Sequence, residues 1–190
     1  MSVSVRDATM RWLDRVVIGW GLCPFARAPR LRPNALSLRV SEARNTATLL
    51  REVDTEIAAL QQGPAETSLI VLPPIAPSEL SDAHSDFAAF MRIGWDVEER
   101  VGKLAPGELQ LALFHPAARC SLYDQGDATP ADFVQRSPFP TLHFLRCKDI
   151  ETLAAGPSAA LAASLPERNV ARMCRKTLSV FSARVSCVAL

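Results

Sequence analysis

The feature that most constrains the fold is a short apolar run, Ser68–Leu72, which ends at Pro73 and Pro74. A continuous apolar run of this length, without polar residues at alternate positions, predicts a strand that is buried on both faces. Such strands lie in the middle of sheets that carry helices on their faces. We therefore expect an α/β fold built around this strand, with an α+β arrangement as the alternative.

Helical and strand patterns alternate along the rest of the chain. Apolar residues recur at helical spacing in four segments, at residues 7–20, 41–63, 82–105 and 166–178. Three further strands are predicted, at residues 36–40, 108–115 and 141–146. This order predicts a small mixed sheet of about four strands flanked by helices, and it also fits a thioredoxin-like strand order. The last two strands pair antiparallel across the long loop 116–140 in this scheme.

Length and composition predict a single domain without a strong overall charge. The chain has 190 residues, of which 48% are hydrophobic and 22% charged, as in ordinary globular domains. We expect one domain over residues 1–190, with a core at about 7–178 and a C-terminal tail at 179–190. A formal net charge of +1 leaves no general field that would attract nucleic acid or an anionic membrane.

The cysteines and the N-terminal segment indicate the cellular compartment in which the protein is expected. The five cysteines are widely spaced and form no Cys-x-x-Cys pair, which indicates free thiols in a reducing compartment. No apolar run approaches the length of a membrane span or forms a signal peptide. We expect a soluble protein of the cytoplasm or of an organelle interior (mitochondrion or plastid), not a secreted one. The Arg-rich start also fits a mitochondrial transit peptide, but it leads directly into Leu22–Phe25, which reads as folded protein.

The first candidate site residue is Cys23, in the segment Gly21–Ala26. Its Cys-Pro-Phe-Ala sequence is similar to the active-site turn of glutaredoxins and omega-class glutathione transferases, where a helix N-terminus lowers the thiol pKa. In those folds a strand precedes the cysteine, whereas a helical pattern precedes Cys23. The residue is therefore either a reactive thiol or a small buried apolar side chain.

Two histidines and an Arg-Ser pair are the remaining candidates. His115 ends a predicted strand, and His143 lies within the next one. Arg136 and Ser137 precede that strand beside two prolines, which would hold a guanidinium in place for a carboxylate or phosphate. Antiparallel pairing would bring both histidines together and Cys23 could join them, as a thiol with a histidine base or as ligands of one zinc-type metal ion. Each residue also has a purely structural interpretation, as a hydrogen-bonded histidine or an arginine that caps loop carbonyls.

Taken together, these segments resemble a family. The short sequence motifs of that family are matched by Trp12-Leu13, Leu22–Ala26, Phe114–Pro116, Arg136–His143 and Glu167–Asn169. In this order they resemble the bacterial and plastid family catalogued as domain of unknown function 1415. The chain departs from the family pattern at Gly21 and Asp132, where Asn is usual, and at Ala118, where an aromatic residue is usual. The resemblance implies no particular reaction, but if these three positions line a pocket, it implies an altered or lost activity.

Two hypotheses about function follow. The first is an enzyme or small-molecule-binding protein that acts on a small anionic ligand, with no cofactor or a single zinc-type ion. Its pocket would consist of Cys23, His115 and His143 as catalytic or metal-binding residues and of Arg136 and Ser137 as ligand-binding residues. The alternative is a non-catalytic interaction protein, or an accessory subunit of a larger complex. In that case a protein partner would dock on the basic loop that carries Arg27, Arg30 and Arg32.

Overall fold

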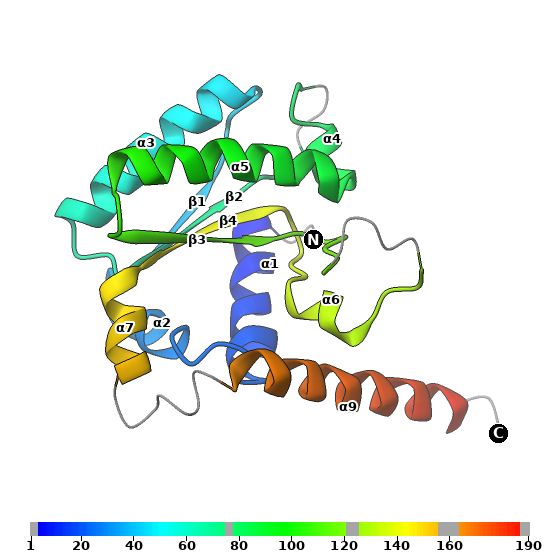
Figure 1. Cartoon of the computed structure of the whole chain (residues 1–190). Coiled ribbons are helices and arrows are strands. Elements are labelled where there is room, and N and C mark those ends of the chain that lie inside the picture. Colours follow the sequence, from blue (N-terminus) through cyan, green and yellow to red (C-terminus); the bar gives the residue numbers. More distant parts are fainter. Residues whose placement is uncertain (1–3, 75–77, 121–125, 156–163, 187–190) are drawn as a thin grey trace.

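The computed structural model describes residues 4–74, 78–120, 126–155 and 164–186. Its centre is a four-stranded mixed sheet in the order β1-β2-β4-β3 (Figure 1). The strands are β1 (Leu36–Val40), β2 (Thr67–Val71), β3 (Leu109–Phe114) and β4 (Thr141–Arg146). β1 and β2 are parallel, and β4 runs antiparallel to both β2 and β3. Every residue of β2 is buried, which confirms the central strand predicted from its apolar run.

Two long helices cover one face of the sheet. α3 (Thr46–Gln62) and α5 (Phe87–Leu104) lie side by side above the strands in Figure 1. Their apolar stripes meet the sheet in one core, made by Leu49, Val53, Ile57, Phe90, Val97, Ile70, Leu142 and Phe144. α3 begins after Asn45, whose side chain accepts a hydrogen bond from the Thr48 amide, and so it starts later than the helical segment predicted at residues 41–63. The short α4 (Asp82–Ser85) precedes α5, and the two are separated by Asp86, which caps α5.

The N-terminal helical segment packs on the opposite face. α1 (Val5–Trp12) continues directly into a π-helical stretch, η1 (Leu13–Ile18), and a short helix α2 (Arg27–Leu31) follows. Trp12, Leu13 and Val17 form a second core with side chains of β1 and β2. The sheet therefore lies between two layers of helix, which confirms the α/β expectation for a single domain with a four-stranded mixed sheet.

The strand order differs from the thioredoxin-like order considered above. A thioredoxin-like core has its first strand inside the sheet, whereas β1 is an edge strand here and β2 lies inside. After the crossover through α5, β3 forms the edge of the sheet opposite β1. The fourth strand then returns antiparallel and fills the gap between β2 and β3.

Besides α2, which forms where the sequence predicted a basic loop, two helices lie outside the elements predicted from the sequence. α7 (Cys147–Ala155) follows β4 without a loop, and α6 (Pro130–Val134) interrupts the long loop. A capping box of Thr129 and Asp132 begins α6. The last helix, α9 (Leu165–Ser186), extends beyond the predicted end at residue 178 into most of the segment assigned to a tail. Among the helices of the described ranges, none has the length and apolar character needed to cross a membrane.

Candidate functional site

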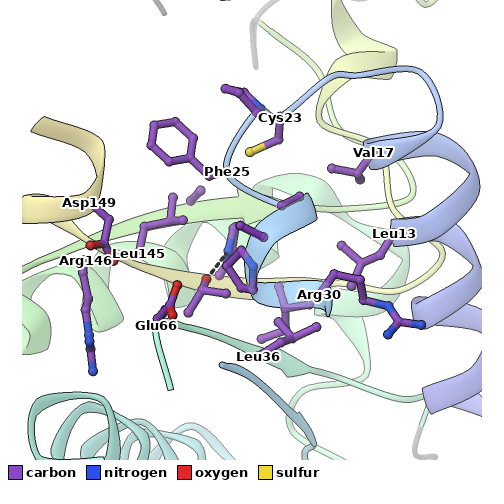
Figure 2. Close-up of a pocket in the computed structure, with 18 of the residues that line it drawn as sticks. Leu13, Val17, Cys23, Phe25, Arg30, Leu36, Glu66, Leu145, Arg146 and Asp149 are labelled. Atoms are coloured by element: carbon purple, nitrogen blue, oxygen red, sulfur yellow. Dashed lines mark hydrogen bonds between the residues drawn. The ribbon is translucent and has the colours of Figure 1, made fainter. Parts of the chain in front are cut away.

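A cavity of about 560 Å³ lies between the sheet and the N-terminal helical segment. Its walls come from α1 and η1, the turn after them, α2, all four strands and α7. Figure 2 shows Cys23 and Phe25 on one side of this cavity and Leu36 and Glu66 on the other. Two predicted site residues, Cys23 and His143, are part of its lining.

The turn that carries Cys23 depends on two glycines and on the π-helical stretch. The amide of Leu22 donates to the Val17 carbonyl at 2.8 Å, which closes a wide turn typical of π-helical geometry. A Cβ atom on Gly19 would lie 2.4 Å from the Arg15 carbonyl oxygen, and Gly21 has a φ of +60°. Both positions therefore suit glycine. Through this turn the chain leaves the helix and returns over the sheet, and π-helical insertions of this kind are frequent at functional sites.

The Cys23 thiol is partly buried. Its sulfur points from the turn towards the interior of the cavity (Figure 2). Burial raises the thiol pKa, although hydrogen bonds from the amides of Phe25 and Ala26 to the sulfur oppose this effect. The thiol is therefore protonated at neutral pH, in contrast to the activated thiolate of a glutaredoxin-type turn.

Helix α9 holds the chain just before Cys23. The Asn169 side-chain amide donates to the Leu22 carbonyl at 2.7 Å, and the Arg172 guanidinium donates to the Gly21 carbonyl. Sequence reasoning did not assign either residue to the site. The only signal was the Glu167–Asn169 motif of the family resemblance, since nothing local links a C-terminal helix to Cys23.

His143 faces the cavity from the middle of the sheet. It pairs with Leu69 on β2 and with Ala112 on β3, and these two residues also line the cavity. The Thr67 hydroxyl donates to the Phe144 carbonyl at 2.9 Å and lies 2.7 Å from His143 Nε2. Since that hydroxyl has one hydrogen, it accepts from Nε2–H, which leaves the lone pair of the neutral ring on Nδ1. Burial lowers the His143 pKa to about 4, so the ring is neutral at pH 7.

His115 lies on the opposite face of the sheet from His143. Ala112, which pairs with His143, lines the cavity, and His115 comes three positions after it. In an extended chain, side chains three positions apart point to opposite faces of the sheet. Its ring is fully buried and packs on Phe90 of α5 at a centroid distance of 5.3 Å. Nε2 lies 3.0 Å from the Ala83 carbonyl, and Nδ1 accepts from the Ala117 amide. The structure therefore does not bring His115 to Cys23 and His143, and its bonds are those of a structural histidine.

Arg136 and Ser137 do not line the cavity either. Ser137 donates to the Phe139 carbonyl at 2.6 Å within its own turn. The Arg136 guanidinium stacks over the Phe133 ring at a distance of 4.2 Å from the ring centroid. The backbone carbonyl of Arg136 accepts a hydrogen bond from the Trp12 indole. Both residues contribute to the entry into β4, but the Arg136 guanidinium stacks on a ring there and, among the residues that the structure describes, is not seen to cap loop carbonyls.

No ligand set for the expected zinc-type ion is found in the described part of the chain. Within those ranges, no three His, Cys, Asp or Glu side chains come together in a way that could hold a metal ion. The predicted set fails because His115 lies across the sheet from the other two residues.

Three arginines of the cavity lining have partners within the protein. Arg30 forms two hydrogen bonds with Asp14, at 2.9 and 3.0 Å, and Arg32 pairs with Glu66. Arg146 donates to two carbonyls at the end of α3, those of Leu60 and Gly63. These contacts reduce the positive charge that the lining offers to a ligand.

The three departures from the family pattern lie outside this lining. Gly21 has positive φ, a conformation that Asn tolerates better than most residues, so the exchange suits the same turn. Asp132 accepts from the Cys120 amide and from the Thr129 amide and hydroxyl, and thereby ties the long loop to α6. Ala118 is fully buried. The condition for an altered activity, that these positions line the pocket, is therefore not met at this cavity.

Comparison with known proteins identifies a family and nothing more specific. Neither the curated proteins nor the solved structures contain a match to the chain. A family model, described as a protein of unknown function (DUF1415), matches residues 4–183. Since that match extends over nearly the whole sequence, the chain belongs to the DUF1415 family.

Proposed function

We propose that the protein is an enzyme that binds a small, largely apolar molecule in the cavity and reacts with it through the Cys23 thiol. His143 would accept the thiol proton. One observation carries the proposal: the two residues are 120 positions apart in the sequence, yet both line one cavity. A thiol next to a histidine base is a recurrent arrangement for nucleophilic catalysis.

The nature of the ligand follows from the lining. A volume of about 560 Å³ is typical of small-molecule sites, and most of the wall is apolar, with Leu13, Val17, Leu36, Leu69 and Leu145 among its residues. The two titratable groups of the proposed pair are both neutral at pH 7, because burial raises the thiol pKa and lowers the imidazole pKa. An uncharged, apolar ligand body therefore fits the interior better than a charged one.

The small anionic ligand expected from the sequence has less support. It depended on Arg136 and Ser137, which do not line the cavity. Two lining arginines, Arg30 and Arg32, are paired with carboxylates, so an anion would have to compete with existing ion pairs. We therefore place any polar group of the ligand at the rim, near the exposed Lys148.

The charge states suggest a reaction between neutral partners. The Cys23 sulfur would attack an electrophilic carbon, such as an ester or thioester carbonyl, while its proton passes to Nδ1 of His143. The new sulfur–carbon bond would replace the bond to the leaving group, which would take the proton from His143. The acylated cysteine would then transfer its acyl group to water or to another acceptor. The step requires Nδ1 within hydrogen-bond reach of the thiol, directly or through one water.

The test measures acyl transfer from p-nitrophenyl acetate, butyrate and octanoate, with mass spectrometry to locate the adduct. We expect acylation of Cys23, at a rate that rises with acyl chain length because the longer chain fills the apolar cavity. Cys23→Ser should abolish the adduct, and His143→Gln should slow its formation about 100-fold. Cys120→Ser is the matched control, since Cys120 is an exposed free thiol outside the lining. Equal rates for all three esters, or an unchanged rate in Cys23→Ser, would refute the proposal.

A second candidate function is the docking of a protein partner on α2. Leu31 is 72% exposed and lies between Arg30 and Arg32 of the basic loop. An exposed leucine between cations suits a partner surface that is apolar with an acidic rim. We rank this function second because both arginines already pair with carboxylates of the chain. Purification of the native protein as a lone monomer, unchanged by salt, would contradict it.

A further inference from the structure

The turn before Cys23 is held by side chains of a distant helix. In the turn, the carbonyl of Leu22 accepts from Asn169 Nδ2 at 2.7 Å, and that of Gly21 accepts from Arg172. Asn169 is only 7% exposed, so its bond to Leu22 is shielded from water. Figure 1 shows the start of α9 beneath the end of the N-terminal helical segment, where this turn begins.

We propose that Asn169 and Arg172 are positioning residues for the Cys23 thiol. By holding the two carbonyls at the entrance of the turn, they orient the amides of Phe25 and Ala26 towards the sulfur. This inference rests on the proposed function, in which Cys23 is the nucleophile.

The geometry of the turn supports this role. Pro24 fixes one backbone torsion directly after Cys23, and α2 begins at Arg27. Only residues 23–26 separate the anchored carbonyls from α2. A change at the entrance of the turn is therefore transmitted to the amides of Phe25 and Ala26, whose hydrogen bonds to sulfur oppose the effect of burial.

The choice of an asparagine supports it as well. Among the described residues, no partner is found for the buried Asn169 Oδ1. Burial of an unpaired carbonyl oxygen costs stability, and a leucine of similar size would avoid that cost. The Asn169 amide is buried although, in the described part of the chain, only its Nδ2 group is hydrogen-bonded. We therefore attribute the presence of an asparagine at this position to its bond with the Leu22 carbonyl.

The experiment measures the rate of Cys23 alkylation by iodoacetamide as a function of pH, in the folded, full-length protein. Asn169→Leu and Arg172→Met should each move the midpoint of the pH profile up by about one unit, because the amide–sulfur bonds weaken. Below the midpoint, alkylation should then be about tenfold slower than in the wild type.

Two variants serve as matched controls. Arg172→Lys keeps a cationic donor for the Gly21 carbonyl and should restore the wild-type midpoint. Arg175→Met removes an exposed arginine from the same helix and should leave the midpoint unchanged. A purely structural role would lower the stability of the variants without moving the midpoint.

The outcomes separate this inference from the proposed function. An unchanged midpoint in folded Asn169→Leu, or in Arg172→Met should the first variant fail to fold, would overturn the positioning role. Iodoacetamide needs no ligand, so the midpoint is read independently of acyl transfer. If the midpoint moves while no ester acylates the wild type, the positioning role stands and the proposed function falls.

Discussion

Acid should destabilise the folded protein through His143. Burial lowers the pKa of this imidazole from 6.5 to about 4 in the folded state. As the pH falls below 6.5, the unfolded chain therefore takes up a proton at this residue, whereas the folded protein resists protonation until about pH 4. Because the unfolded state binds more protons in this window, stability decreases as the pH falls through it and is fully present above it.

The size of the effect follows from the shift. Each pKa unit corresponds to about 1.4 kcal/mol, so lowering the pH from 7.5 to 4.5 removes about 2.5 kcal/mol through this residue alone. This is an upper value, since the ring is partly open to the cavity. We expect a loss of about 1 to 2.5 kcal/mol.

The assay is urea unfolding at pH 7.5 and 4.5, for the wild type and for His143→Gln. Glutamine keeps an amide donor for the Thr67 hydroxyl but does not titrate. The buried His115, whose pKa is also lowered by burial, is present in both proteins and cancels in the comparison. The reasoning is refuted if His143→Gln loses as much unfolding free energy between the two pH values as the wild type does.

Four substitutions test the packing by the same unfolding measurement at pH 7.5. Glu56→Leu removes a buried carboxylate that accepts from two serine hydroxyls and an arginine, and should cost about 3 kcal/mol; a loss below about 1 kcal/mol would contradict this estimate. Gly94→Ala places a Cβ 2.4 Å from Leu113 Cδ1 and should destabilise by about 1 kcal/mol, whereas Gly102→Ala in the same helix meets nothing within 4 Å and should stabilise by about 0.5 to 1 kcal/mol. Equal effects at the two glycines would contradict the packing argument. Trp12→Phe leaves a loop carbonyl without its indole donor and should cost about 1 kcal/mol; an unchanged unfolding free energy would mean that this bond does not contribute.

Local patterns in the sequence were enough to predict most of the fold. The apolar run at β2 and the helical stripes of α3 and α5 depend on residues close together in the chain, and the structure confirms them. The family was also recognised from the sequence, because its motifs are short and contiguous. Helix α7 was not predicted, since it starts directly at the end of β4 with no loop between them.

The site depended on information that the local sequence lacks. Strands 3 and 4 were predicted to pair antiparallel, and they do, but whether two histidines share a face depends on the register of that pairing. A shift of one residue exchanges the faces. Sequence reasoning therefore selected both His115 and His143, and only the observed register places His143 in the cavity and His115 against α5.

The sequence alone determined the chemical groups that the protein has available, among them a thiol in a tight Gly-Pro turn, two imidazoles and an arginine beside prolines. The tertiary structure decided which of them meet. It brought Cys23 and His143 into one cavity, paired the nearby arginines with carboxylates, and placed Asn169 on the turn before the thiol. The physical reason is that these contacts join residues 16 to 147 positions apart, which no local pattern specifies. Burial also changes the pKa of a group according to its surroundings in space rather than its neighbours in sequence.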